Sequence, residues 1–439
     1  MNFSIVRIIK NFLFIYLSFV IFIYSFIKSK NNFFDDYYFI YFLFSGLVLT
    51  FGIFFLFLKN EIKNKIILVF FSIIISLYLI EGFIGYQYYQ NYSSKIKLKK
   101  NYDTKSSFDA YMSYKEKYND LKYRIIPKQF WKENDAELLP LSTFSNSTIF
   151  NCNENGYFSI WKSDMFGFNN PSQEWNKKNG ILLLGDSFTA GECVYEKDNI
   201  AGNLRQKLNN RKIINLGMGG NGPLTNYATL KEYFFTINPK IVLWFHNEGN
   251  DFDDLNQELN NEILNKYLSN DNFTQELIIK QDEVDYKLNK FLSANEESID
   301  KTTYQNKFDW TRFFKLYTVR ELTIHSIFSK PHKISKEFYL IINKSKNYIE
   351  KNNSEFYFIY LPQFHRYTNY YSFQNSKNYK KIIKYLIKNK IKYIDINKEV
   401  FQKIKDPLDL FPFKSAGHYN EKGYRLIAET IYKKLKLSN

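Results

Sequence analysis

The sequence is poor in cysteine and histidine, which limits the covalent and metal chemistry open to it. Its 439 residues contain two cysteines, so at most one disulfide bond can form within the chain, and five histidines. His325, His332 and His365 have none of the spacing to cysteine or carboxylate residues that is typical of metal sites. We therefore expect neither a metal centre nor a cofactor.

A concentrated positive charge is also missing, although the chain as a whole is basic. Sixty Lys and Arg residues against 44 Asp and Glu give a formal net charge of +16. The lysines are spread along the whole chain among Asn, Ile, Tyr and Phe residues, and no nucleic-acid-binding motif occurs. We therefore expect no nucleic-acid partner, and the charge favours attraction to anionic envelope surfaces.

Long stretches of the first 88 residues carry no charge. Residues 11–27 and 37–58 have none, and residues 66–80 are apolar, with hydrophobic character continuing to about Tyr88 past Glu81. Each stretch is close to the roughly 20 residues of a bilayer-spanning helix. A signal peptide explains one such stretch but not three, and none has the polar face of a soluble helix. The sequence predicts a three-helix transmembrane anchor over residues 1–88.

The distribution of basic residues predicts how this anchor is oriented. The N-terminus and the second loop carry more basic residues than the first loop, which has Lys28 and Lys30, and acidic residues count for little in this comparison. The residues on the predicted cytoplasmic side are Arg7, Lys10, Lys59, Lys63 and Lys65. The protein is then a multi-pass protein of a cytoplasmic membrane with an extracytoplasmic domain. Four lysines between residues 95 and 100 favour the opposite orientation.

The predicted compartment also bears on the two cysteines. Their number alone leaves two reduced thiols or one disulfide as alternatives. An oxidising compartment favours a disulfide between Cys152 and Cys193. It would tether the segment before the first predicted strand to the turn after residue 187.

From residue 181 onward the sequence alternates between strand and helix patterns. The predicted strands are 181–184, 212–216, 241–245, 355–361 and 392–396, and the predicted helices include one capped by Asp198, 225–237, 376–389 and 421–437. This alternation predicts an α/β fold, a doubly wound parallel sheet of about five strands. Residues 89–180 form a connector and lead-in region. Within the α/β domain of residues 181–439, residues 256–337 are interpreted as a helical insertion that caps the strand ends.

Two polar motifs each follow a predicted strand, and a third precedes the last predicted helix. Gly185-Asp186-Ser187 follows the first strand, Gly249-Asn250-Asp251 follows the third, and Gly417-His418 lies near the C-terminus. A serine just beyond the carboxyl end of a buried parallel strand lies where open α/β sheets carry out chemistry. In their order, these motifs resemble those of the SGNH (GDSL-type) hydrolase family. The resemblance covers residues 150–255 and about the last 25.

The resemblance implies a role for each motif. Ser187 matches the family's nucleophile and His418 the base that a serine needs for attack on an ester. Gly220 matches the glycine whose backbone N–H stabilises the oxyanion, with Gly219 as an alternative, and Asn250 matches the asparagine whose amide is a further donor.

One position departs from the family pattern. The family has an aspartate three residues before the histidine, where it orients the imidazole, but this chain has Ser415. Asp409 or Asp406, in the preceding loop, is a candidate for the orienting acid. The remaining alternative is a Ser–His dyad without an acid.

Three further segments resemble a bacterial membrane-anchored subgroup of the family. They are residues 152–156, 167–171 and 191–194. The resemblance implies an extracytoplasmic serine esterase whose partners are the membrane and an ester-bearing glycan or lipid substrate. Two alternatives remain: an O-acyltransferase that uses the same site, and a catalytically silent SGNH module that binds glycans or assists assembly.

Overall fold

The structure, a computed structural model, divides the chain into two compact units. It describes residues 3–31, 36–97, 102–132, 137–208, 210–299, 310–320, 334–368 and 372–436. Unit 1 comprises residues 1–91 and 308–329, and unit 2 comprises residues 92–307 and 330–439. Part of the predicted insertion, residues 308–329, therefore groups with the N-terminal helices.

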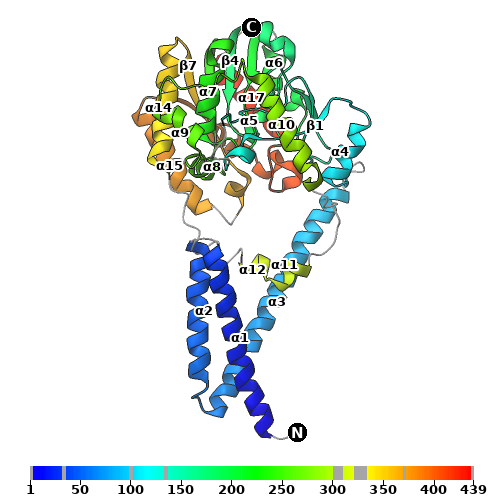
Figure 1. Cartoon of the computed structure of the whole chain (residues 1–439), viewed down its shortest axis with the longest axis vertical. Helices are drawn as coiled ribbons and strands as arrows, with labels where there is room; N and C mark the ends of the chain where they lie inside the picture. The colour runs from blue at the N-terminus through cyan, green and yellow to red at the C-terminus, as the bar shows by residue number, and fades with distance from the viewer. Residues whose placement is uncertain are drawn as a thin grey trace. The chain divides into compact units, whose positions relative to one another are not determined.

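Unit 1 contains three long helices and two short ones. These are α1 (Phe3–Asn31), α2 (Asp36–Phe55), α3 (Asn60–Lys97), α11 (Trp310–Phe314) and α12 (Tyr317–Arg320). Helices α1 and α2 pack side by side (Figure 1). Among the described residues, one helix is long and apolar enough to cross a membrane, over Asn60–Tyr86 of α3, and the apolar stretch Tyr41–Phe55 of α2 is shorter. Spans through α1 and α2 remain predictions.

The lead-in region of unit 2 forms a small sheet that the sequence did not predict. After α4 (Ser107–Lys115), strands β1 (Leu121–Tyr123), β2 (Thr148–Phe150) and β3 (Ile160–Lys162) pair in that order. Strands β1 and β2 are parallel, and β2 and β3 are antiparallel. Each strand has only three residues, which is too short for a recognisable alternating pattern.

The main sheet of unit 2 has five parallel strands in the order β5-β4-β6-β7-β8, so the predicted parallel α/β fold is confirmed. Their bounds are β4 (Lys178–Leu184), β5 (Arg211–Asn215), β6 (Pro239–Asn247), β7 (Glu355–Leu361) and β8 (Lys392–Asp395). The strand order reverses around β4, which lies between β5 and β6. Ligands of such sheets bind beyond the carboxyl ends of the strands at this reversal.

Both faces of the sheet are covered, because alternate strand residues point to opposite sides. Leu182, Val242 and Phe358 join one hydrophobic core with α7 (Pro223–Ile237) and α14 (Lys336–Lys351). Ile181, Leu243 and Ile359 join a second core with α6 (Ile200–Lys207) and α17 (Glu421–Lys434). The strands are apolar on both sides because both sides are buried.

The remaining elements connect and cover these layers. They are α5 (Ser187–Ala190), α8 (Asp251–Glu258), α9 (Glu262–Ser269), α10 (Gln281–Asn295), α15 (Ser372–Lys388), α16 (Ile396–Glu399), and the 3-10 helices η1 (Pro127–Phe130), η2 (Ser172–Asn176), η3 (Glu196–Asp198), η4 (Glu296–Ser298), η6 (Phe364–Tyr367), η7 (Phe401–Lys403), η8 (Pro407–Leu410) and η9 (Pro412–Lys414). Helix α9 of the predicted insertion packs against α7, as does α8, which begins before the insertion.

The prediction that Asp198 caps the first helix of the α/β domain was wrong. Helix α6 is capped by Asn199, whose side-chain oxygen accepts a hydrogen bond from the N–H of Gly202 at 2.7 Å. Asp198 instead ends the 3-10 turn η3. Both residue types are good N-caps, so the sequence alone could not separate two neighbouring candidates.

Candidate functional site

Ser187 lies at the first position of α5, directly after the buried strand β4. Asp186 caps this short helix by accepting a hydrogen bond from the N–H of Phe188 at 3.0 Å. Gly191 ends it with φ +77°, a left-handed conformation that glycine adopts without strain. Ser187 is 8% exposed. The turn therefore fixes the serine at the carboxyl edge of the sheet.

His418 reaches this serine from the other end of the domain. It precedes α17, which Asn420 caps through the N–H of Gly423 at 2.9 Å. Its Nε2 lies 2.8 Å from Ser187 Oγ. In the tautomer with hydrogen on Nδ1, Nε2 accepts the hydroxyl hydrogen, as a general base requires. The two residues are 231 positions apart in sequence.

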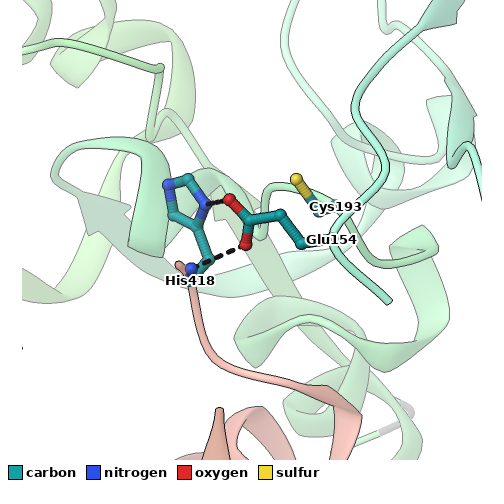
Figure 2. Close-up of side chains that lie close together, drawn as sticks. All are labelled: Glu154, Cys193 and His418. Atoms are coloured by element: carbon teal, nitrogen blue, oxygen red, sulfur yellow. Dashed lines mark hydrogen bonds and ion pairs between the residues drawn. The ribbon is translucent and has the colours of Figure 1, made fainter. Parts of the chain in front are cut away.

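Glu154 is the acid that binds the other side of the imidazole (Figure 2). Its Oε1 lies 2.9 Å from His418 Nδ1, and its Oε2 accepts a hydrogen bond from the backbone N–H of His418 at 2.7 Å. Two contacts from one carboxylate fix both the ring and the backbone of the histidine. Ser187, His418 and Glu154 thus form one continuous hydrogen-bonded series.

The predicted orienting acids do not occupy this position. Asp406 and Asp409 both form ion pairs with Lys414, at 2.6 and 2.8 Å. Ser415, at the position of the family aspartate, donates its hydroxyl hydrogen to the carbonyl of Phe413 at 3.3 Å. The structure therefore places the acid on a segment far from the histidine in sequence, rather than in the loop before it.

A disulfide bond joins the loop of Glu154 to the turn that follows Ser187. Cys152, two residues before Glu154, is bonded to Cys193, six residues after Ser187, with the Cα atoms 4.8 Å apart. Figure 2 shows Cys193 beside Glu154 and His418. The bond closes a loop across 41 positions of sequence. We infer that it holds the acid against the imidazole.

Removing this disulfide is expected to lower both stability and turnover. For a loop of this length, the lost chain-entropy contribution is about 4 kcal/mol. A displacement of Glu154 by about 1 Å lowers kcat roughly 10²-fold. The measurements are chemical denaturation and ester turnover of the Cys152→Ser/Cys193→Ser variant and of reduced wild type. A variant that keeps wild-type kcat would show that the bond does not position Glu154.

The charges of the histidine and the acid stabilise one another. Burial lowers the pKa of His418, but the adjacent carboxylate of Glu154, aided by Glu192 and Asp186, outweighs burial and raises it to about 9. Burial likewise opposes the charge on Glu154, but His418 and Arg124 outweigh it and lower the pKa of this carboxyl group. The structure therefore favours an imidazolium–carboxylate pair over a wide pH range.

This pair predicts the pH dependence of the reaction. A general base must be neutral, so kcat/KM is expected to rise with pH as His418 loses its proton, with an apparent pKa above 6.5 and near the value of about 9. The Glu154→Gln variant removes the charge that raises this pKa, so its profile is expected to shift to lower pH. The measurement is kcat/KM for an activated ester from about pH 5 to about pH 10. Identical apparent pKa values in the two proteins would contradict the pairing.

The two predicted oxyanion residues both lie beside a Lys128–Asp254 ion pair of 2.5 Å. Gly220 has φ +74°, and a Cβ there would lie 3.1 Å from Lys128 Cδ. The amide of Asn250 donates to Asp254 at 2.7 Å, which leaves its second hydrogen for another acceptor. Their roles as donors to an oxyanion stay predictions.

A second acid connects the histidine to the glycine loop. Glu192 Oε2 lies 3.8 Å from His418 Nε2, and Oε1 forms an ion pair with Arg124. A Cβ on Gly219, the alternative oxyanion glycine, would overlap both Glu192 and Arg124. The ends of these two side chains therefore lie directly against the backbone at Gly219, and a larger residue there would displace them. Glu192 lies in segment 191–194, whose resemblance to the subgroup implied no role for it, and no motif marks Arg124.

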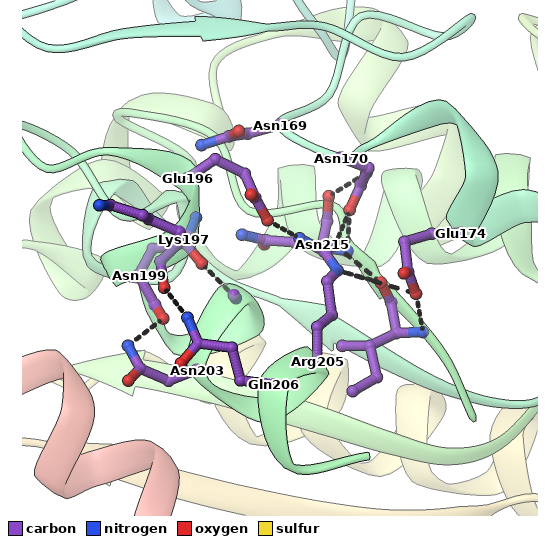
Figure 3. A network of polar contacts seen from close by, with 12 residues as sticks. Asn169, Asn170, Glu174, Glu196, Lys197, Asn199, Asn203, Arg205, Gln206 and Asn215 are labelled. Carbon is purple, nitrogen blue, oxygen red and sulfur yellow. Dashed lines mark hydrogen bonds and ion pairs between the residues drawn. The ribbon is translucent and has the colours of Figure 1, made fainter. Parts of the chain in front are cut away.

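A buried polar network supports the short helix that carries Ser187 (Figure 3). Arg205 Nη2 donates to Asn170 Oδ1 at 2.5 Å, and the same oxygen accepts the N–H of Asn215 at 2.8 Å. The side chain of Asn215 in turn donates to the carbonyl of Thr189 at 2.8 Å, and Asn169 donates to that of Ala190 at 3.2 Å. These bonds satisfy carbonyl groups at the end of α5, which would otherwise lack partners.

Among the described residues, one group of side chains has the spacing of a metal site, and two of its three members belong to the Ser187–His418–Glu154 series. Glu154, Cys193 and His418 offer atoms within 4.8 Å of one another. The sulfur of Cys193 is in the disulfide, and the carboxylate and imidazole bond each other, so this set is not a metal-ligand set. His246 is fully buried, and its Nδ1 lies 2.7 Å from Asp251. His325 and His332 lie outside the described residues.

Comparison with known proteins gives structural likenesses of low identity. No protein-family model matches the chain, and no curated protein matches it. A member of the lipolytic protein G-D-S-L family from Veillonella parvula is 13% identical, with 59% of this chain and 99% of that chain covered and a TM-score of 0.34. A lipase/acylhydrolase from Enterococcus faecalis is 12% identical (59% and 96% covered, TM-score 0.35). An acetyl xylan esterase is 15% identical (58% and 99% covered, TM-score 0.32).

Proposed function

We propose that the chain is a serine esterase of the SGNH type. The observation that carries this proposal is the hydrogen-bonded series from Ser187 through His418 to Glu154, with distances of 2.8 and 2.9 Å. A nucleophile, a base and an acid that orients the base are the three groups that acyl transfer through serine requires. Ser187 follows strand β4 at the carboxyl edge of the sheet, where open α/β sheets bind their ligands, and the other two residues are hydrogen-bonded to it in series.

The geometry supports a two-step reaction. His418 Nε2 takes the hydroxyl proton of Ser187 while Oγ attacks the ester carbonyl carbon. The resulting tetrahedral intermediate collapses as the imidazolium returns the proton to the leaving alcohol, which gives an acyl-enzyme. Water, activated by the same imidazole, then releases the acid. Glu154 keeps hydrogen on Nδ1 and stabilises the imidazolium that forms in each step.

The oxyanion is assigned to three donors in this proposal. They are the backbone N–H groups of Ser187 and Gly220 and the free hydrogen of the Asn250 amide. The N–H of Ser187 lies at the start of α5, where backbone donors are available to an anion. Asn250 follows β6 directly and is braced by Asp254. Loss of one such donor costs about 10²- to 10³-fold in kcat.

The proposed setting is a bacterial cytoplasmic membrane, with unit 1 as a multi-pass anchor and unit 2 outside the cytoplasm. Support comes from the apolar span in α3 and from the disulfide, which forms in oxidising compartments. An anchored enzyme in this place meets ester-linked acyl groups of envelope glycans and lipids. These are the proposed substrates.

O-acyl transfer is the second candidate, because the acyl-enzyme of Ser187 accepts a sugar hydroxyl as readily in principle as water. The alternative of a catalytically silent module was based on Ser415, which stands where the family has an aspartate. Glu154 contacts the imidazole in place of that aspartate, so this reason no longer applies.

The test is turnover of a short-chain nitrophenyl ester by the full-length protein, with a glycan acceptor present or absent. Free acid in both cases identifies an esterase, and acylated glycan identifies a transferase. The absence of any turnover together with the absence of an acyl-enzyme would overturn the proposal.

A further inference from the structure

A segment of the insertion docks on the last third of the apolar span of α3. Both oxygens of Glu81 accept backbone hydrogen bonds from this segment, from Thr318 at 3.0 Å and Val319 at 2.8 Å. Glu81 is 3% exposed. A buried carboxylate in an apolar helix is costly unless hydrogen bonds satisfy it. These two bonds therefore account for an acid inside the span.

Aromatic contacts extend this docking along one face of α3. Tyr78 donates its hydroxyl hydrogen to the carbonyl of Phe314 at 3.0 Å, and its ring lies 5.4 Å from that of Phe313. A Cβ at Gly82 would lie 3.5 Å from a ring carbon of Phe313, so the ring packs against the helix at this position. Residues 78, 81 and 82 share one helix face by their spacing. The segment is thus bound to α3 by hydrogen bonds and a ring contact along this face.

The exposed residues of the segment include two aromatic residues and Lys315. Trp310 and Phe314 are 61% and 64% exposed, and their rings stack with centroids 6.0 Å apart. Residues 310–320 contain Arg312, Lys315 and Arg320 and no acidic residue. Exposed aromatic rings with basic residues are typical of segments at a membrane–water interface.

The position of the segment along α3 matches that interface. Glu81 lies five residues before Tyr86, where the candidate span ends, which corresponds to about 8 Å along a helix. The hydrocarbon core of a bilayer is about 30 Å thick. Phe83 and Tyr86 of α3 are also exposed at this level and add to its aromatic surface.

We propose that residues 310–320 form an interfacial element, with Trp310 and Phe314 inserted among lipid headgroups and the exposed Lys315 facing anionic lipids. This inference rests on the proposed membrane anchoring of α3. The proposed partner of this element is the bilayer that α3 spans, because the exposed rings are continuous with the surface of α3 that would face lipid. The chain passes between the two units three times, at 91–92, 307–308 and 329–330. The insertion therefore adds two covalent connections between unit 2 and unit 1 to the one that follows α3.

The test uses full-length protein in vesicles of phosphatidylcholine and phosphatidylglycerol, made with or without acyl chains brominated near the headgroup. The emission of Trp310 is obtained by subtracting the tryptophan fluorescence of the Trp310→Phe variant from that of wild type. Bromination is expected to lower this difference at least twofold. Equal emission in both vesicles, from protein that floats with them, would overturn the inference and leave the esterase proposal intact. Protein that does not float overturns both the anchor and the interfacial element.

A matched pair of variants tests the docking itself. Glu81→Leu removes both acceptors and is expected to reduce the quenching of Trp310, whereas Glu61→Leu, at the exposed start of α3, is expected to leave it unchanged. Turnover of the soluble nitrophenyl ester by each variant reports whether unit 2 is folded and tests the proposed function separately. Unchanged quenching in Glu81→Leu would overturn the docking on Glu81. Cross-linking between copies through Phe314→Cys, without quenching, would identify a second copy as the occupant and overturn the lipid assignment.

Discussion

Replacing Ser187 by alanine is expected to lower ester turnover by about 10⁶-fold, the order of magnitude for loss of a nucleophile that acts as a unit with its base. The reason is that Ser187 Oγ, which lies 2.8 Å from His418 Nε2, is the proposed nucleophile that attacks the ester. The measurement is kcat for a short-chain nitrophenyl ester. Ser269→Ala, an exposed serine on α9, is the matched control and is expected to keep wild-type kcat.

A double variant makes this prediction sharper. Residues that act as one catalytic unit give non-additive losses. Ser187→Ala/His418→Ala is therefore expected to be no slower than either single variant. If the two losses multiplied instead, the serine and the histidine would be acting independently, which would contradict the proposed proton transfer between them.

Replacing Glu154 by glutamine is expected to lower kcat by about 10⁴-fold with little change in KM. This is the effect of removing an acid that holds the imidazole in the correct tautomer while the geometry is kept. Glutamine is nearly isosteric, and its oxygen can still accept from His418, but it supplies no charge to stabilise the imidazolium.

Asp409→Asn is the control for this variant. Asp409 pairs with Lys414 at 2.8 Å, so its loss is expected to leave kcat unchanged. A large loss in Asp409→Asn, with wild-type turnover in Glu154→Gln, would restore the loop acid that the family pattern suggests and remove Glu154 from the site.

The sheet was predictable because its strands are buried on both faces. Residues 181–184 and 241–245 are apolar without interruption, and the structure places them side by side as parts of β4 and β6. The short strands β1 to β3 were not predictable, since three residues carry no periodicity. Segment 308–329 was assigned to a helical insertion for a different reason. Its partner Glu81 lies more than 230 positions away, and no local pattern indicates a contact at that separation.

The site was predictable only where a local motif marks it. Ser187 and His418 follow from their motifs, and the structure brings them together. Glu154 does not, because its position depends on a loop folding across 264 positions of sequence. The two cysteines could have indicated the position of Glu154. If Cys152 bonds Cys193, the residues beside Cys152 must lie near the turn after Ser187, and Glu154 is the acid among them.

The most direct test of the central claim, that Ser187 is a nucleophile activated by His418 and Glu154, is to map the adduct of a fluorophosphonate probe by mass spectrometry of the full-length protein. The account predicts one phosphonylated peptide, modified at Ser187, with labelling absent in Ser187→Ala and much slower in Glu154→Gln. Equal labelling of wild type and Ser187→Ala, or an adduct on another residue, would contradict it.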